Sequence, residues 1–91
     1  MSLRIIYTLG YLKRAAEFLK RHPEILPQYE KTLKLLELNP SHPSLRLHRL
    51  DGPLRELHSV SINLSYRITL EFLLEDGKIV PVNVGSHDEV Y

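Results

Sequence analysis

Apolar residues in the first half of the chain recur at the spacing of α-helices. Between residues 11 and 21 they lie three or four positions apart, with charged residues on the other side. They are Leu12, Ala15, Ala16 and Leu19. This spacing predicts a helix with one buried face. His22 precedes Pro23, and proline disfavours helical geometry in the residue before it, so we expect the helix to end there.

A second helix is predicted over residues 24–38. Its apolar face consists of Ile25, Tyr29, Thr32, Leu33 and Leu36. Pro27 is compatible with this helix because it falls in the first turn, and Asn39-Pro40 ends it. Since only a short turn separates the two helices, we expect an antiparallel helical hairpin that packs its apolar faces against a sheet.

The remaining segments alternate with the period of two that is typical of strands. The alternating or β-branched runs are residues 4–8, 45–48, 59–64, 66–74 and 79–84, and the loop 39–43 precedes the second of them. We expect Gly10 to act as a breaker, and Asp76-Gly77 to form a hairpin turn. Residues 66–74 read as the central strand. Pro81 lacks an amide donor, which favours an edge or bulged position for the last strand.

These elements predict an α+β fold in a single domain, residues 1–91. The expected order is one strand, the two-helix hairpin and then a three-stranded antiparallel meander, with the helices on one face of the sheet. A chain of 91 residues has room for one hydrophobic core.

Composition narrows the function classes. The chain has no cysteine, which excludes disulfides and thiolate metal sites. Its first residues lack the long apolar segment of a secretory signal or membrane span, so we expect a cytoplasmic protein without a membrane partner. The formal net charge of +1 is far from the strongly basic balance of many nucleic-acid-binding proteins.

The five histidines do not predict a metal site or another cofactor. They are His22, His42, His48, His58 and His87. None of them forms the i, i+4 pair of helical zinc enzymes, and they fall in separate predicted elements.

Two short motifs carry a family resemblance. One is the step Tyr66-Arg67-Ile68 in the central strand, and the other is the ending Gly-Ser-His-Asp-Glu-Val-Tyr at residues 85–91. Together with the order of elements, they resemble the RelE/ParE toxin superfamily, and the ending is similar to its YafQ-like subgroup. The resemblance implies a type II toxin that a cognate antitoxin neutralises in a hetero-oligomeric complex.

For the activity, the resemblance implies cleavage of messenger RNA in the ribosomal A site without a metal. The ribose 2′-hydroxyl attacks the adjacent phosphate, so the enzyme must supply a proton acceptor, a proton donor and positive charge. Matched to the family, Arg67 would contact the scissile phosphate and His87 would transfer a proton. Tyr91 would stack on a base or orient the 2′-hydroxyl, and His48 resembles the histidine before the family's Leu-x-Gly turn.

Three further residues are expected to bind the substrate. They are Arg49, Arg55 and His58. Arg49 and Arg55 belong to a basic cluster around the predicted turn at residues 51–53, and His58 stands at the start of the next strand. Serines near Ser61 and Ser65 occupy positions where YafQ-like members have a histidine and an aspartate.

Two other functions remain open from the sequence. A ParE-like protein of the same fold would inhibit DNA gyrase by binding, since a fold does not determine a function. A decayed toxin would only bind its antitoxin and regulate transcription with it. The basic side of the first helix is most simply interpreted as a solvated surface, and the two functional alternatives are a contact with ribosomal RNA and an antitoxin site. Its residues are Lys13, Arg14, Lys20 and Arg21.

Overall fold

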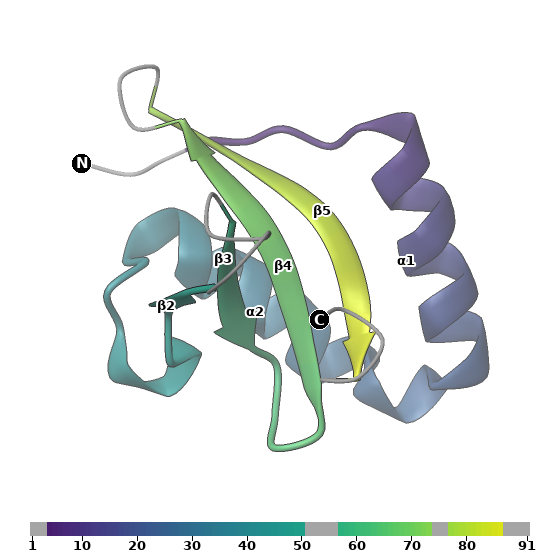
Figure 1. Ribbon diagram of the computed structural model, residues 1–91. Helices are drawn as coiled ribbons and strands as arrows, with labels where there is room; N and C mark the ends of the chain where they lie inside the picture. Colours follow the sequence, from purple (N-terminus) through teal and green to yellow (C-terminus); the bar gives the residue numbers. More distant parts are fainter. Residues whose placement is uncertain (1–3, 51–56, 74–76, 87–91) are drawn as a thin grey trace.

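Two helices and a five-stranded sheet make up the fold (Figure 1). The computed structural model describes residues 4–50, 57–73 and 77–86. In chain order the elements are β1 (Arg4–Ile5), α1 (Leu9–Arg21), the 3-10 turn η1 (Pro23–Ile25), α2 (Leu26–Leu38), the 3-10 turn η2 (Pro43–Leu45), β2 (His48–Arg49), β3 (His58–Ser61), β4 (Tyr66–Leu73) and β5 (Lys78–Ser86). The α+β class and the order of elements are confirmed.

The sheet has the strand order β1-β5-β4-β3-β2. As predicted, β3, β4 and β5 form an antiparallel meander, with β4 in the centre. The short β1 extends the sheet by pairing parallel to β5, and β2 extends it on the other side by pairing antiparallel to β3. β1 ends at Ile5, earlier than the predicted residue 8.

The last strand contains a bulge, and β1 covers only its first two residues. β5 lies between β1 and β4 in the strand order, but β1 pairs only with Lys78 and Ile79. Among the described residues, no strand therefore pairs with β5 on that side at Pro81, which agrees with a local edge position. The bulged alternative is confirmed, because Thr69 pairs with Asn83 whereas Leu70 pairs with Pro81, leaving Val82 as the extra residue. The bulge also meets α1: the Val82 carbonyl accepts hydrogen bonds from Nε and Nη2 of Arg14, at 3.2 and 2.8 Å.

Helix α1 begins earlier and faces the core differently from the prediction. The Thr8 hydroxyl caps it by accepting from the Tyr11 amide at 3.1 Å, so Gly10 lies inside the helix instead of ending the strand before it. The buried residues are Tyr11, Ala15 and Phe18, whereas Leu12 is 46% exposed. The predicted face is confirmed for Ala15, which is buried, and for Leu19, which packs partly buried against the core. It was wrong for Leu12 and Ala16, because the aromatic rings of Tyr11 and Phe18 take the buried positions and remove more apolar surface from water.

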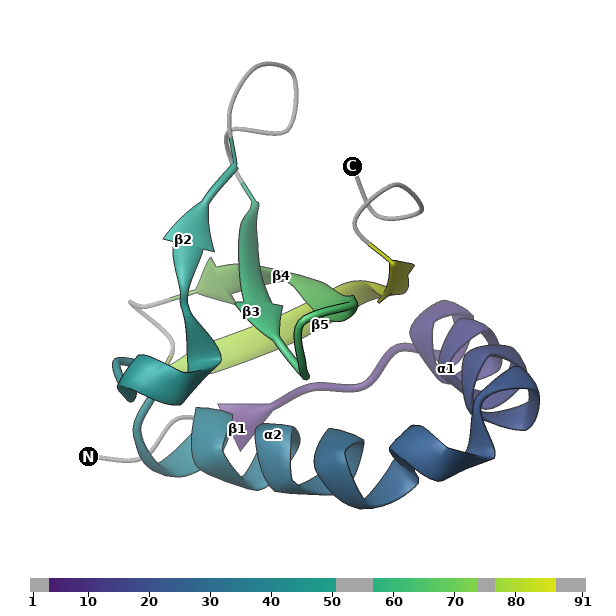
Figure 2. The same ribbon diagram turned by 90° about the horizontal axis from the view of Figure 1, so that it is seen from below.

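Helix α2 buries the predicted residues Tyr29, Thr32 and Leu36. It passes across one side of the sheet, while α1 lies beside β5 (Figure 2). The helices diverge from their short turn and do not lie alongside each other as the predicted antiparallel hairpin would. They are joined instead by a buried hydrogen bond of 2.6 Å between the hydroxyls of Tyr11 and Tyr29.

The segment after α2 forms less strand than predicted. Residues 43–45 make a 3-10 turn capped by His42, whose Nδ1 accepts from the Ser44 amide at 3.2 Å. Arg46 then adopts a left-handed backbone with φ of 47°. Pro43 is the first residue of the 3-10 turn, and proline at that position favours a helical turn over an extended strand. β3 also ends earlier than residue 64, and Leu64 is 89% exposed in the following bend.

None of the helices in the described residues is long and apolar enough to cross a membrane.

Candidate active site

The central strand β4 presents different chemistry on its two faces. Ile68 and Leu70 are fully buried toward the helices. Because side chains alternate along a strand, Arg67 and Thr69 point to the opposite face. The face of the sheet that carries Arg67 and Thr69 is called the polar face below. It includes the residues paired with these two in β3 and β5, and His48 of β2.

Arg67 is half-buried on the polar face. It pairs with Ser61 of β3 on one side and with Gly85 of β5 on the other. Its guanidinium turns toward β3, where Nη1 donates a hydrogen bond to Oγ of Ser59 at 3.3 Å. A guanidinium has five N–H donors in a planar fork, so this contact leaves others available for an anion.

His48 is brought to the same face. It pairs with Ser59 across β2 and β3, so the serine that contacts Arg67 is also the cross-strand neighbour of His48. The imidazole is exposed, and its Nδ1 lies 3.2 Å from the Arg46 carbonyl oxygen. A carbonyl only accepts, so Nδ1 donates in this contact.

Arg49 and His58 are not brought to the polar face. His58 pairs with Leu70 and with Arg49, so the alternation directs both side chains to the other side of the sheet from Arg67. Burial lowers the pKa of His58, and the nearby charges of Arg49 and His48 lower that pKa further. His58 is therefore biased toward its neutral form at pH 7.

Three predicted site residues, Arg55, His87 and Tyr91, lie outside the described residues. The described chain does define where the C-terminal segment begins. β5 ends at Ser86, and Gly85 lies directly opposite Arg67. The last described residues of β5 thus lie beside the arginine.

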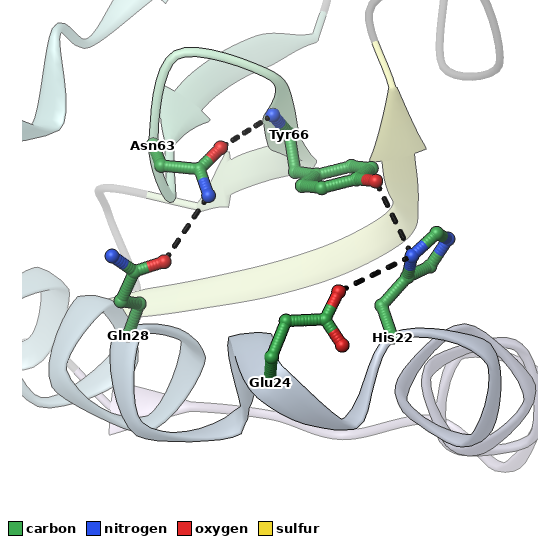
Figure 3. A network of polar contacts seen from close by, with 5 residues as sticks. All are labelled: His22, Glu24, Gln28, Asn63 and Tyr66. Carbon is green, nitrogen blue, oxygen red and sulfur yellow. Dashed lines mark hydrogen bonds and ion pairs between the residues drawn. The ribbon is translucent and has the colours of Figure 1, made fainter.

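A polar network anchors the start of β4, one residue before Arg67 (Figure 3). The Asn63 side chain accepts from the amides of Ser65 and Tyr66 at 2.8 and 2.9 Å, and donates to Oε1 of Gln28 in α2 at 3.1 Å. These bonds tie the bend between β3 and β4 to the second helix.

The Tyr66 side chain provides the other anchor. Its hydroxyl lies 3.2 Å from Nδ1 of His22, and the same nitrogen is 3.8 Å from Oε1 of Glu24. Phe18 packs edge-on against the Tyr66 ring at a centroid distance of 5.1 Å. The backbone that carries Arg67 is therefore fixed from the helix side of the sheet.

Sequence reasoning did not identify Ser59 as a site residue. The alternation of serines with apolar residues in β3 predicted a half-buried strand, and it gave no sign that one hydroxyl would contact Arg67. Such a contact depends on the β3–β4 register, in which Ser59 pairs with Thr69, two residues after Arg67.

Within residues 4–50, 57–73 and 77–86, no cluster of three histidine, aspartate or glutamate residues could hold a metal ion.

Solved structures share this architecture. YafQ from E. coli strain BL21(DE3) superimposes with a TM-score of 0.79 over 98% of each chain, at 15% sequence identity. The YoeB/ParE toxin from Agrobacterium tumefaciens gives a TM-score of 0.70 at 14% identity, over 93% of this chain and 99% of that one. The chain has the fold of the RelE/ParE toxins.

The E. coli DinJ–YafQ toxin–antitoxin complex also matches, with a TM-score of 0.78 at 17% identity over 100% of this chain and 99% of that chain. No protein-family model matches the sequence, and no curated protein matches it. The likeness to the RelE/ParE toxins is thus a likeness of fold.

Proposed function

We propose that this protein is the toxin of a type II toxin–antitoxin system and cleaves messenger RNA in the ribosomal A site. The observation that carries the proposal is the polar face. There, Arg67 is held half-buried on the central strand, near an exposed histidine and beside the start of the C-terminal segment. An arginine fork in such a place suits a phosphate that gains charge during a reaction.

In the proposed reaction, the ribose 2′-oxygen attacks the adjacent phosphorus and the bond to the 5′-oxygen of the next nucleotide breaks. The products are a 2′,3′-cyclic phosphate and a 5′-hydroxyl. His48 suits the proton acceptor, because its exposed imidazole lies on the same face as Arg67. His87 then donates a proton to the leaving 5′-oxygen, and Arg67 stabilises the charge on the phosphorane.

Tyr91, Arg49, Arg55 and His58 have supporting roles in this proposal. Tyr91 positions the nucleotide by stacking, as the family resemblance implies. The two arginines contact RNA phosphates, and His58 makes a less important contact with the RNA. Because Arg49 and His58 point away from Arg67, any contact they make is with RNA outside the scissile position.

The Arg67 guanidinium supports an RNA substrate, since arginines gain affinity by releasing counterions from phosphates. The partner that restrains the toxin is a cytoplasmic antitoxin. Support comes from the fold, which is shared with the toxin of the DinJ–YafQ complex.

The test uses ribosomes programmed with a defined messenger RNA. Added protein is expected to produce new RNA ends at the A-site codon, and naked RNA is expected to stay intact. His87→Ala should abolish the new ends while leaving the circular dichroism spectrum unchanged. A folded wild-type protein that cuts neither RNA would contradict the proposal, and inhibition of gyrase supercoiling by that protein would support the ParE-like alternative.

A further inference from the structure

We infer that Ser59 is a positioning residue, which orients Arg67 toward His48 for the reaction. The inference rests on the proposed function, because the orientation matters only where a phosphate is bound and a proton is transferred beside it. The hydrogen bond from Arg67 Nη1 to Ser59 Oγ, at 3.3 Å, is its starting point.

Ser59 is a rigid anchor. It is fully buried, and its strand is paired on both sides, to His48 in β2 and to Thr69 in β4. A serine has a single side-chain torsion, whereas an arginine loses much rotamer freedom when it is fixed. The hydroxyl therefore restrains the long side chain and is itself held by the sheet.

The neighbouring hydroxyl of Ser61 is engaged elsewhere. Ser61 is the residue directly opposite Arg67, but its Oγ donates to the Asn63 carbonyl at 2.6 Å. The hydrogen bond to Ser59 instead draws the guanidinium along the strand by two cross-strand pairs, to the next residue on the same face. That displacement is toward the strand position next to His48.

The long bond suits an orienting role. At 3.3 Å it is beyond the usual range for N–H···O, so it holds the fork in place without competing strongly with a charged ligand. The remaining N–H groups can then meet phosphate oxygens. Loss of the contact should leave RNA binding nearly intact and slow the chemical step, because misorientation of a catalytic group mainly affects the transition state.

Thr69 offers a matched control. It pairs with Ser59 on the same face and is almost as buried, with 2% exposure. Among the described residues its Oγ1 has no hydrogen-bond partner. Thr69→Val therefore removes a hydroxyl next to Ser59 without touching the Arg67 contact.

The experiment measures A-site cleavage by wild type, Ser59→Ala, Arg67→Ala, the double variant and Thr69→Val, all checked for folding by circular dichroism. Ser59→Ala should lower kcat about tenfold with little change in KM, which corresponds to ~1.4 kcal/mol. In the Arg67→Ala background, Ser59→Ala should cause no further loss, and Thr69→Val should cleave like wild type. The inference would be overturned if Ser59→Ala left kcat unchanged, or if it lowered kcat equally in the wild-type and Arg67→Ala proteins.

A second readout needs no cleavage, so it separates this inference from the proposed function. In NMR spectra, the guanidinium signal of Arg67 is assigned by its absence in Arg67→Ala. Ser59→Ala should accelerate the rotation of that guanidinium, and Thr69→Val should not. If wild type fails to cleave RNA, the proposed function fails; if the rotation is unaffected by Ser59→Ala, the positioning role fails.

Discussion

The two faces of β4 differ in how their contacts are used. On the helix side, Ile68 and Leu70 are fully buried, and Tyr66 packs against Phe18 and His22. These contacts exclude water and fix the strand. Neighbouring side chains of the same strand can thus serve stability on one face and a site on the other.

On the polar face, buried groups are small and hydroxyl-bearing. Ser59 and Thr69 are almost fully buried, and the long side chain of Arg67 lies against the serine. From this comparison we expect Arg67 to be needed for the reaction and not for folding. Ile68, the next residue, should be needed for folding and not for the reaction.

The largest expected effect on stability is that of Ile68→Ala. Truncating a fully buried isoleucine should cost about 2–5 kcal/mol of unfolding free energy, through lost burial and a residual cavity. Urea unfolding followed by circular dichroism measures it. Leu64→Ala is the control, because that leucine is 89% exposed and should change stability by less than ~0.5 kcal/mol. Equal costs for both variants would contradict the division between the faces.

The tyrosine pair between the helices should give a smaller loss. Tyr11→Phe leaves the Tyr29 hydroxyl without its 2.6 Å partner in a buried site, which should cost about 1–3 kcal/mol. The double variant Tyr11→Phe/Tyr29→Phe should cost less than the sum of the single variants. Strict additivity in urea unfolding would show that the hydroxyls are not coupled.

The same pair predicts a loss of stability at alkaline pH. Burial raises the pKa of the Tyr11 and Tyr29 hydroxyls above that of the unfolded chain, which is about 10. The folded state then holds protons that the unfolded state releases, so stability is fully present below pH 10 and declines as the pH rises above it. Unfolding free energies between pH 8 and 11 should fall more steeply for wild type than for the double phenylalanine variant.

The smallest expected change is a gain. Within the described part of the chain, Thr69 Oγ1 is buried without a hydrogen-bond partner, and valine has nearly the same shape. Thr69→Val should raise the unfolding free energy by about 1 kcal/mol, because it removes an uncompensated polar group. Thermal unfolding measures the shift, and Thr69→Ser, which keeps the hydroxyl, should show no gain. A destabilised valine variant would indicate that the hydroxyl has a partner.

Local patterns predicted the strands and helices well, because periodicity reports burial directly. The central strand and the apolar face of α2 followed from spacing alone. The errors arose where the three-dimensional partner decided the outcome. Tyr11 and Phe18 took the buried positions that were predicted for Leu12 and Ala16, and β1 paired with the first two residues of β5.

The site was only partly predictable for the same reason. Arg67 and His48 were identified from motifs, and the structure brings them to one face. Ser59 could not be identified, because its role depends on a register across two strands. Arg49 and His58 were expected to bind the substrate next to the catalytic candidates, but alternation directs their side chains to the other side of the sheet.

The most direct test of the polar face is the A-site cleavage rate of Arg67→Ala, measured on protein of known unfolding free energy. Stability should change by no more than about 1 kcal/mol, whereas cleavage should fall roughly 100- to 1,000-fold, as for the loss of a charge-stabilising donor. Arg4→Ala, at an exposed arginine of β1, should leave both unchanged. A stably folded Arg67→Ala protein that cuts at the wild-type rate would contradict the assignment of the polar face as the active site.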